Sequence, residues 1–405
     1  MILKIQIYIL LLLVSLDATS QTRDNSSYIY GTIITESDEE YTGFIRWGNE
    51  EMYWHDIFNS VKVESYKAPE NITTRTLEKI DWSLKSLWSD NYCESCNTNK
   101  SFACLFGDLA QIEIIRGKRA RLTFRNGSTI DVDGGSNDIG SRIQMTDYEL
   151  GAINFDWDDI EFIKFKIAPD QASPPYGDPL YGTIITERKK KFKGYIKWDL
   201  DERHGQDLLN GESKYGDQSI PFENISLMEK IRNGNGLRVT FQSGREIEIE
   251  GSNDCNKGNR GIAIFRHDIG NIEMAWSDFK SVTFDKAPAK VYGPFEEPQR
   301  IAATMLTYDD VAWEGPIAFD KDEVWDFEFV DGDDDDIEYQ IPFRNISKIV
   351  PKNRSFSMVH LKNGDVLLLG EKQDVSSDND GVILNATSDQ QEIINWDNII
   401  EIIFK

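Results

Sequence analysis

Tyr30–Glu36 reads YGTIITE, and the same seven letters return at Tyr181–Glu187, 151 positions later. A coincidence of this length is improbable, so the stretch indicates an internal duplication, which changes how every other segment is interpreted. The match continues downstream, where Gly43–Trp47 (GFIRW) corresponds to Gly194–Trp198 (GYIKW). The sequence therefore predicts that two parts of the chain share one fold.

A third and more divergent copy follows these two. Thr304–Thr307 (TMLT) stands where the other copies have TIIT, and Gly315–Phe319 (GPIAF) begins eight residues after its last threonine, as in the first two copies. We predict three repeats, over residues 28–167, 180–286 and 300–405, separated by proline-rich joints.

A shorter signature occurs six times: an aromatic residue, any residue, Asp or Asn, an apolar residue, any two residues and another apolar residue. Because an Asp or Asn side chain can accept a backbone N–H two or three residues on, each copy predicts a strand, a 3₁₀-like turn and another strand. Six copies in three repeats predict two half-units per repeat. The copies begin at Phe106, Trp157, Phe222, Trp276, Phe343 and Trp396.

The stretches between these signatures alternate apolar and polar residues, as strands do. Residues 238–284 contain five such short runs separated by turn residues. This pattern predicts an all-β fold in which each half-unit resembles a small five-stranded SH3-like or Sm-like barrel. The chain also resembles a group of uncharacterised exported bacterial repeat proteins, a likeness of fold pattern that implies no function.

The alternative architecture is an array like a six-bladed propeller, with one signature in each blade. Propeller blades recur at even spacing, whereas the steps between successive signatures here are 51, 65, 54, 67 and 53 residues. The alternation of short and long steps favours paired barrels.

The N-terminus has the composition of a secretory leader. Lys4 is followed by an apolar run over 7–14 and by small residues at 18–20, so we expect residues 1–20 to be removed as a signal peptide. The mature chain is then exported, to the periplasm, the cell envelope or the medium. We expect no transmembrane segment in it, because no later apolar run reaches the ~20 residues that a spanning helix needs.

The chain is strongly acidic, with 70 Asp and Glu against 44 Lys and Arg and a net charge of −26. Such a surface repels nucleic acid, so a nucleic-acid partner is not expected.

Four cysteines stand at Cys93, Cys96, Cys104 and Cys255. In an exported chain they suggest disulfides, and a four-thiolate zinc site is the alternative. Three of them lie in or next to an insertion in the first repeat, residues 63–103, where 76–88 has roughly helical apolar spacing.

The familiar catalytic signatures, such as a nucleophile elbow, a zinc-protease helix or a phosphate-binding loop, were not found in the sequence. The four histidines, His55, His204, His267 and His360, occupy different offsets in the repeats, and we interpret them as exposed loop residues.

One polar constellation follows the second predicted strand of each repeat. It reads Trp47-x₃-Glu51-x₄-Asp56, then Trp198-x₃-Glu202-x₄-Asp207, and fades to Phe319-x₃-Glu323-x₄-Glu328. An apolar pair flanked by acid and Asn suggests a capped helical turn over a barrel mouth. The functional interpretation is an acidic loop whose tryptophans offer stacking faces to a ligand.

A second constellation is the turn sequence Gly-Ser-Asn-Asp at 135–138, repeated at 251–254 with Asn253 and Asp254. Its oxygens suit a tight turn, or Ca²⁺ as the one cofactor worth considering. These residues, with the six of the first constellation in repeats 1 and 2, form the candidate binding set.

The leading functional hypothesis is a non-enzymatic binding or structural protein that recognises a protein or glycan through these loops. Repeated units without a unique catalytic set multiply a surface rather than build one active site. The alternative is a hydrolase that uses a pair of carboxylates on an extracellular glycan.

Overall fold

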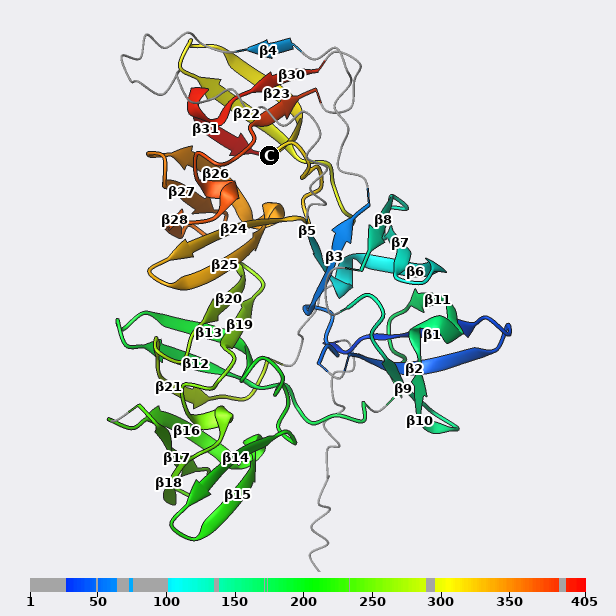
Figure 1. Ribbon diagram of the computed structural model, residues 1–405, viewed down its shortest axis with the longest axis vertical. Helices are drawn as coiled ribbons and strands as arrows, with labels where there is room; N and C mark the ends of the chain where they lie inside the picture. Colours follow the sequence, from blue (N-terminus) through cyan, green and yellow to red (C-terminus); the bar gives the residue numbers. More distant parts are fainter. Residues whose placement is uncertain are drawn as a thin grey trace, which may run out of the picture.

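The computed structural model describes residues 27–48, 50–63, 73–75, 101–134, 138–170, 172, 174–232, 234–288, 296–385 and 391–405. This part of the chain is all-β, since its helical elements are three-residue 3₁₀ turns and its strands form sheets of ten and twenty-one strands (Figure 1). Neither sheet closes into a barrel. The all-β prediction is confirmed, and the division into small barrels stays a prediction.

The N-terminal segment supplies the ten-stranded sheet. Its strands are β1 (Tyr30–Thr35), β2 (Glu40–Trp47), β3 (Ile57–Lys62), β5 (Ser101–Leu105), β6 (Leu109–Arg116), β7 (Arg119–Phe124), β8 (Thr129–Asp133), β9 (Ile143–Asp147), β10 (Gly151–Phe155) and β11 (Ile160–Phe165).

The middle and C-terminal segments share the second sheet, because β20 and β25 pair directly. The middle strands are β12 (Tyr181–Thr186), β13 (Lys191–Lys197), β14 (Leu208–Ser213), β15 (Gly216–Pro221), β16 (Ile225–Lys230), β17 (Gly236–Phe241), β18 (Glu246–Glu250), β19 (Ile262–Arg266), β20 (Gly270–Met274) and β21 (Phe279–Phe284). The C-terminal strands are β22 (Ala302–Thr307), β23 (Ala312–Ala318), β24 (Phe329–Asp334), β25 (Ile337–Pro342), β26 (Ile346–Pro351), β27 (Phe356–Leu361), β28 (Val366–Gly370), β29 (Val382–Leu384), β30 (Glu392–Ile394) and β31 (Ile399–Phe404), with β4 (Thr73–Arg75) parallel to β30.

The repeated stretch that opens the sequence forms the same hairpin in each segment. Gly31 pairs with Gly43, Gly182 with Gly194, and Ala303 with Gly315. The first strand of each hairpin also pairs with the last strand of its segment, and in all three the register shifts just before the final threonine.

Close packing explains two of the repeated glycines. A Cβ at Gly43 would lie 2.0 Å from the carbonyl oxygen of Thr146, and one at Gly194 would lie 2.3 Å from that of Phe265. Both distances are shorter than any real contact, so neighbouring backbone occupies the place of a side chain.

The six-fold signature forms turns as predicted. Five copies are 3₁₀ turns and the copy at Trp276 is a hydrogen-bonded turn. The backbone carbonyl at each Asp or Asn accepts an N–H from a neighbouring loop, as Asp108 does from Arg125. The predicted local side-chain cap is wrong at two copies. The carboxylate of Asp108 binds Arg344, and the amide of Asn345 donates to the carbonyls of His267 and Ile269.

Strand pairing in the middle segment does not follow the order of the strands along the chain. In the middle segment β19 pairs with β13, and β21 pairs with both β12 and β16. Strands β14 to β18 therefore form an insertion between β13 and β19, and the chain returns afterwards to complete the first group. Local alternation predicted where strands occur, but it did not predict this interleaved order.

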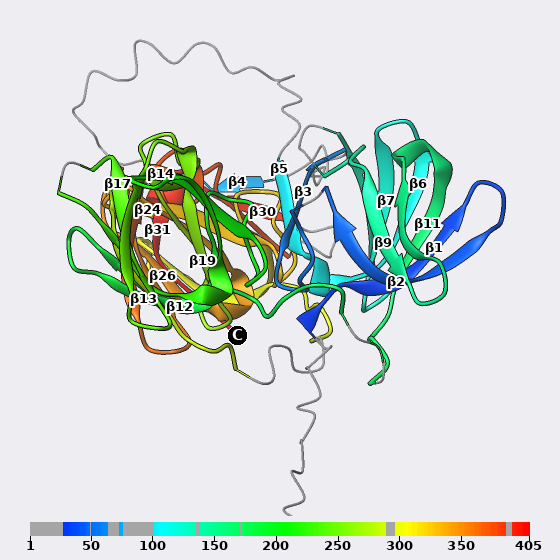
Figure 2. The ribbon, with the colours of Figure 1, turned by 90° about the horizontal axis from the view of Figure 1, so that it is seen from below.

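Side chains from different segments share their cores. Phe327 of the C-terminal segment is fully buried in the N-terminal core and stacks on Phe124 with ring centroids 4.3 Å apart. A small apolar cluster of Leu105, Tyr195 and Phe265 joins the N-terminal and middle segments. Strands β3 and β5 end the order of the N-terminal sheet and lie on the side of it that faces the other two segments in both views (Figures 1 and 2).

Several sequence predictions concern residues outside the described ranges. They are the leader at 1–20, most of the insertion at 63–103 with Cys93 and Cys96, and the first three residues of the turn at 135–138. Cys104 and Cys255 are described. Both are buried, in different hydrophobic clusters, and they are not bridged to each other. Within the described ranges, no helix is long and apolar enough to cross a membrane.

Candidate functional site

The first polar constellation forms an equivalent loop in each segment, directly after β2, β13 and β23. Each loop is closed by an isolated bridge, which joins Trp47 to Glu51, Trp198 to Glu202 and Phe319 to Glu323. The residue after the aromatic has a positive φ in all three loops, and glycine occupies that position in the first. The sequence pattern therefore encodes one tight left-handed turn.

The acidic residue that ends each loop binds the loop's own backbone. One carboxylate oxygen of Asp56 accepts hydrogen bonds from the N–H groups of Met52 and Tyr53, at 2.7 and 2.8 Å. Asp207 and Glu328 accept from the residues four and three positions before them. A strand begins at the next residue each time, so the predicted helical turn is wrong. These carboxylates cap a loop, and extended backbone follows.

The two tryptophans do not face solvent. Trp47 and Trp198 are fully buried, and their indole N–H groups donate to the backbone carbonyls of Asp138 and Asp254, at 3.0 and 2.9 Å. The prediction that they offer stacking faces to a ligand is wrong. An indole with a satisfied N–H inside an apolar cluster is a core residue.

These hydrogen bonds connect the second constellation, at Asp138 and Asp254, to the first. The carboxylates of Asp138 and Asp254 accept the backbone N–H of Asn59 and Asn210, at 2.7 and 2.6 Å. Asp374 does the same for Asp331 in the C-terminal segment. The two polar patterns that recur along the sequence therefore contact each other and belong to one structural unit.

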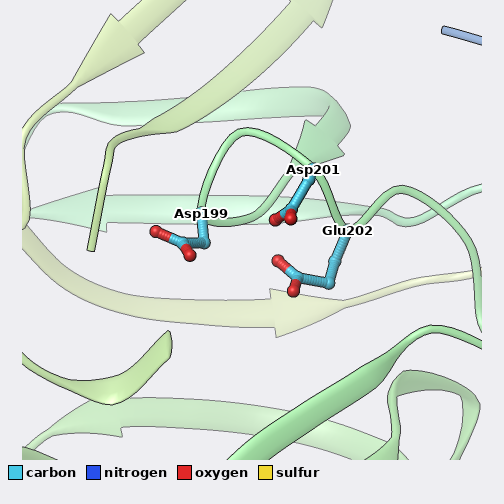
Figure 3. A group of neighbouring side chains, drawn as sticks. All are labelled: Asp199, Asp201 and Glu202. Atoms are coloured by element: carbon cyan, nitrogen blue, oxygen red, sulfur yellow. The ribbon is translucent and has the colours of Figure 1, made fainter. Parts of the chain in front are cut away.

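In the middle segment this unit gathers three carboxylates. Asp199, Asp201 and Glu202 point toward one another (Figure 3), with one oxygen of each within 4.8 Å of the others. Burial and the neighbouring Asp201 raise the pKa of Glu202 to about 10, so Glu202 is protonated at neutral pH. Arg260 Nη2 lies 2.5 Å from Asp201 Oδ2 and 3.4 Å from Asp199 Oδ2, and the side-chain amide of Asn253 donates a hydrogen bond to Asp199.

A cavity of about 160 Å³ lies where the first loop meets the middle segment. It brings Glu51 and Asp56 of the predicted set together with two cations that the prediction did not include, Lys197 and Arg203. Glu202, Asp207, Asn253 and Asp254 do not line it. The remaining polar wall consists of Tyr53, His55, Asn59, Asn271, Glu273 and Gln340.

The charged side chains that line this cavity form ion pairs with one another. Arg203 and Asp56 form a buried pair, with 8% and 2% of their surfaces exposed, and Arg203 also donates to the carbonyl of Glu50 at 2.9 Å. Lys197 Nζ lies 3.5 Å from Glu51 Oε1. Burial raises the pKa of Glu51 to about 7, although Lys197 opposes the shift. Glu51 is therefore able to accept or donate a proton near neutral pH.

Aromatic rings form another part of the cavity wall. His55 stacks on Tyr53 and on Phe265, with centroids 5.2 and 4.8 Å apart, and lies 4.8 Å from Tyr195. Burial, with smaller effects of His267 and Arg203, lowers the pKa of His55 well below its usual value. The ring is neutral, and the expectation of an exposed loop histidine is wrong at this position, where 4% of the residue is exposed.

Two buried polar atoms on this wall lack a hydrogen-bond partner among the described residues. They are the hydroxyl oxygen of Tyr53, a residue 1% exposed, and Nδ1 of His55. A buried polar group without a partner costs about 1–3 kcal/mol, so such groups in a cavity indicate that something else binds them. The only sequence signal was the aromatic cluster Tyr53-Trp54-His55 inside the first loop.

Comparison of the chain with protein-family models, with curated proteins and with solved structures gives no match.

Proposed function

We propose that this chain is an exported, non-enzymatic binding protein that holds a small, neutral, hydroxyl-rich ligand, such as one sugar residue of a glycan, in the cavity between its first two segments. The observation that carries the proposal is a pair of buried polar atoms without hydrogen-bond partners among the described residues, the Tyr53 hydroxyl and His55 Nδ1. Both belong to residues that line a cavity together with charged, amide and apolar side chains.

The size of the cavity favours a small ligand. Its 160 Å³ is below the range of roughly 300–1,000 Å³ for pockets that enclose drug-sized molecules, and it is several times the ~30 Å³ share of one water. The wall mixes donors (Lys197, Tyr53) with acceptors (Glu51, His55 Nδ1). Its charges nearly cancel when Glu51 is protonated. A neutral molecule with several hydroxyls matches such a lining, because each hydroxyl both donates and accepts.

The architecture that we propose around this site is three repeats, each of two small five-stranded SH3-like units. The equivalent hairpins, loops and turns of the three segments support it. Duplication followed by divergence explains why the three loops share one backbone conformation although the side chains around them differ. Export is proposed from the leader at residues 1–20, and N-terminal sequencing of secreted material tests it by starting near Gln21.

A carboxylate hydrolase acting on a glycan is the second candidate, and the raised pKa of Glu51 favours it, since a general acid must be protonated near neutral pH. Its nearest cavity partner, Asp56, is held by Arg203 and by two backbone N–H groups, so it is poorly placed to act as a base. Binding therefore explains the site better than hydrolysis.

Calorimetric titration of the full chain with a panel of sugars and polyols tests the proposal. Lys197→Met removes a cation from the cavity, and Lys193→Met, on the same strand but half exposed and paired with Asp285, is the matched control. We expect binding that Lys197→Met weakens at least tenfold and Lys193→Met leaves unchanged. Equal binding by both variants, or none in the parent chain, would refute the cavity as the ligand site. Turnover of a glycoside that is lost in Glu51→Gln would favour the hydrolase.

A further inference from the structure

A second and more acidic cavity lies between β3 and β5 of the N-terminal segment and the loops of the C-terminal segment, with a volume of about 840 Å³. Seven carboxyl-bearing residues and a single lysine, Lys372, line it. So many acidic groups around one cavity require compensation by bound protons or by cations.

The equivalent place in the middle segment shows what compensation looks like. There the backbone N–H of Arg260 donates to Asp199, and the guanidinium lies against Asp199 and Asp201. In the C-terminal segment the corresponding N–H belongs to Asp380 and donates to Asp320. A carboxylate thus replaces the guanidinium at a matched backbone position, and the local charge becomes more negative by two.

Two lysines compensate part of this charge, Lys62 at the acidic cluster itself and Lys372 beside it. Lys62 lies 3.1 Å from Asp322 and also pairs with Glu328. Lys372 lies 3.6 Å from Asp333 and 3.4 Å from Glu338, at the edge of the cavity.

The carboxylates are spaced for a metal ion. One oxygen each of Asp320, Asp322 and Glu323 lie within 4.8 Å of one another. Because Ca²⁺ binds oxygens at roughly 2.3–2.6 Å, two of its ligands are separated by at most about 5 Å. Each pair of these oxygens is therefore close enough to bind the same ion.

An independent observation comes from the other wall. Ser60, on β3, is 3% exposed and lines the same cavity, and its hydroxyl oxygen has no hydrogen-bond partner among the described residues. Buried oxygens of Glu323 and Asp331 are likewise without hydrogen-bond partners there. A buried hydroxyl and buried carboxylate oxygens, on residues that line one cavity, are the hard oxygen donors that a cation or its bound water uses.

We propose that the acidic cluster beside this cavity binds one divalent cation, with Ca²⁺ preferred, held by Asp320, Asp322 and Glu323; Asp320 and Glu323 line the cavity together with Ser60 and Asp331. Ca²⁺ suits it better than Mg²⁺, because the donors are clustered carboxylates on loops rather than an octahedral set with room for several waters.

The test is calorimetric titration of the full chain, freed of metal with chelator, with CaCl₂ in the presence of excess Mg²⁺. We expect one site per chain. Glu323→Gln should weaken binding at least tenfold. Asp380→Arg, which installs the arginine of the middle segment, should abolish binding while the melting temperature measured without calcium stays the same or rises.

Glu202→Gln is the matched control, since it alters the equivalent acid beside Arg260, and it should change the affinity less than twofold. The proposal is overturned if the parent chain binds no Ca²⁺, or if Glu323→Gln and Glu202→Gln weaken binding equally, which would indicate diffuse attraction to an acidic surface. It is also overturned if a folded Asp380→Arg protein binds as tightly as the parent.

Discussion

Replacement of Arg203 by Met tests whether the first two segments are held together by the buried ion pair. The guanidinium pairs with Asp56, donates to the carbonyl of Glu50 and lies 5.8 Å from the ring centre of Tyr53. Methionine fills much of the same volume without charge, so the change isolates the electrostatic contribution.

The structure sets the expected magnitude. Removal of one partner from a buried pair costs about 3–5 kcal/mol, because the other charge is left without compensation. Asp56 keeps its two backbone N–H donors, which places the loss at the lower end, about 3 kcal/mol. Arg260→Met is the comparison, since that guanidinium is about half exposed and such pairs contribute no more than about 1 kcal/mol.

Urea unfolding followed by tryptophan fluorescence measures both variants, with the transitions of the segments fitted separately because a chain of this size need not unfold in one step. The double variant Arg203→Met/Asp56→Asn should recover about 2 kcal/mol, since it removes the stranded charge and keeps an oxygen for the loop N–H groups. A loss of about 1 kcal/mol or less in Arg203→Met, equal to that of Arg260→Met, would refute the assignment of this pair as a principal contact between segments.

Three further outcomes are expected. Folding raises the pKa of Glu51 from 4.5 to about 7. Its contribution to the free energy of unfolding, up to ~3 kcal/mol, is therefore fully present below pH 4.5 and is lost as the pH rises through 7. Glu51→Gln should remove this pH dependence from the free energy of unfolding measured between pH 5 and 8. Lys62→Met strands the buried acids Asp322 and Glu328 and should lower stability by about 3–5 kcal/mol, and limited proteolysis should then release the N-terminal segment sooner. Gly194→Ala places a methyl group 2.3 Å from the carbonyl oxygen of Phe265, so the melting temperature should fall by an amount equivalent to about 1–3 kcal/mol. An unchanged melting temperature would contradict the close approach of β13 and β19.

The sequence predicted those features that neighbouring residues decide among themselves. Alternation placed the five strands of residues 238–284 correctly, and the aromatic-x-Asx rule located turns at all six positions. The repeated YGTIITE stretch predicted one hairpin in two places, and the register of Gly31 with Gly43 and of Gly182 with Gly194 agrees with it. Each of these depends on backbone preferences and contacts over a few residues, and a local pattern is sufficient to encode them.

Only the tertiary structure decided how the loops are used. Trp47 and Trp198 were expected at the surface, yet strands that arrive much later in the chain bury them. His55 lies against Phe265, and Lys62 reaches Asp322, across 210 and 260 positions of sequence. The loops at 198–202 (WDLDE) and 319–323 (FDKDE) are nearly the same in sequence, but the residue folded back onto them is Arg260 in one and Asp380 in the other. Burial and charge compensation depend on which distant groups surround a side chain, and the order of residues does not state that until the chain has folded.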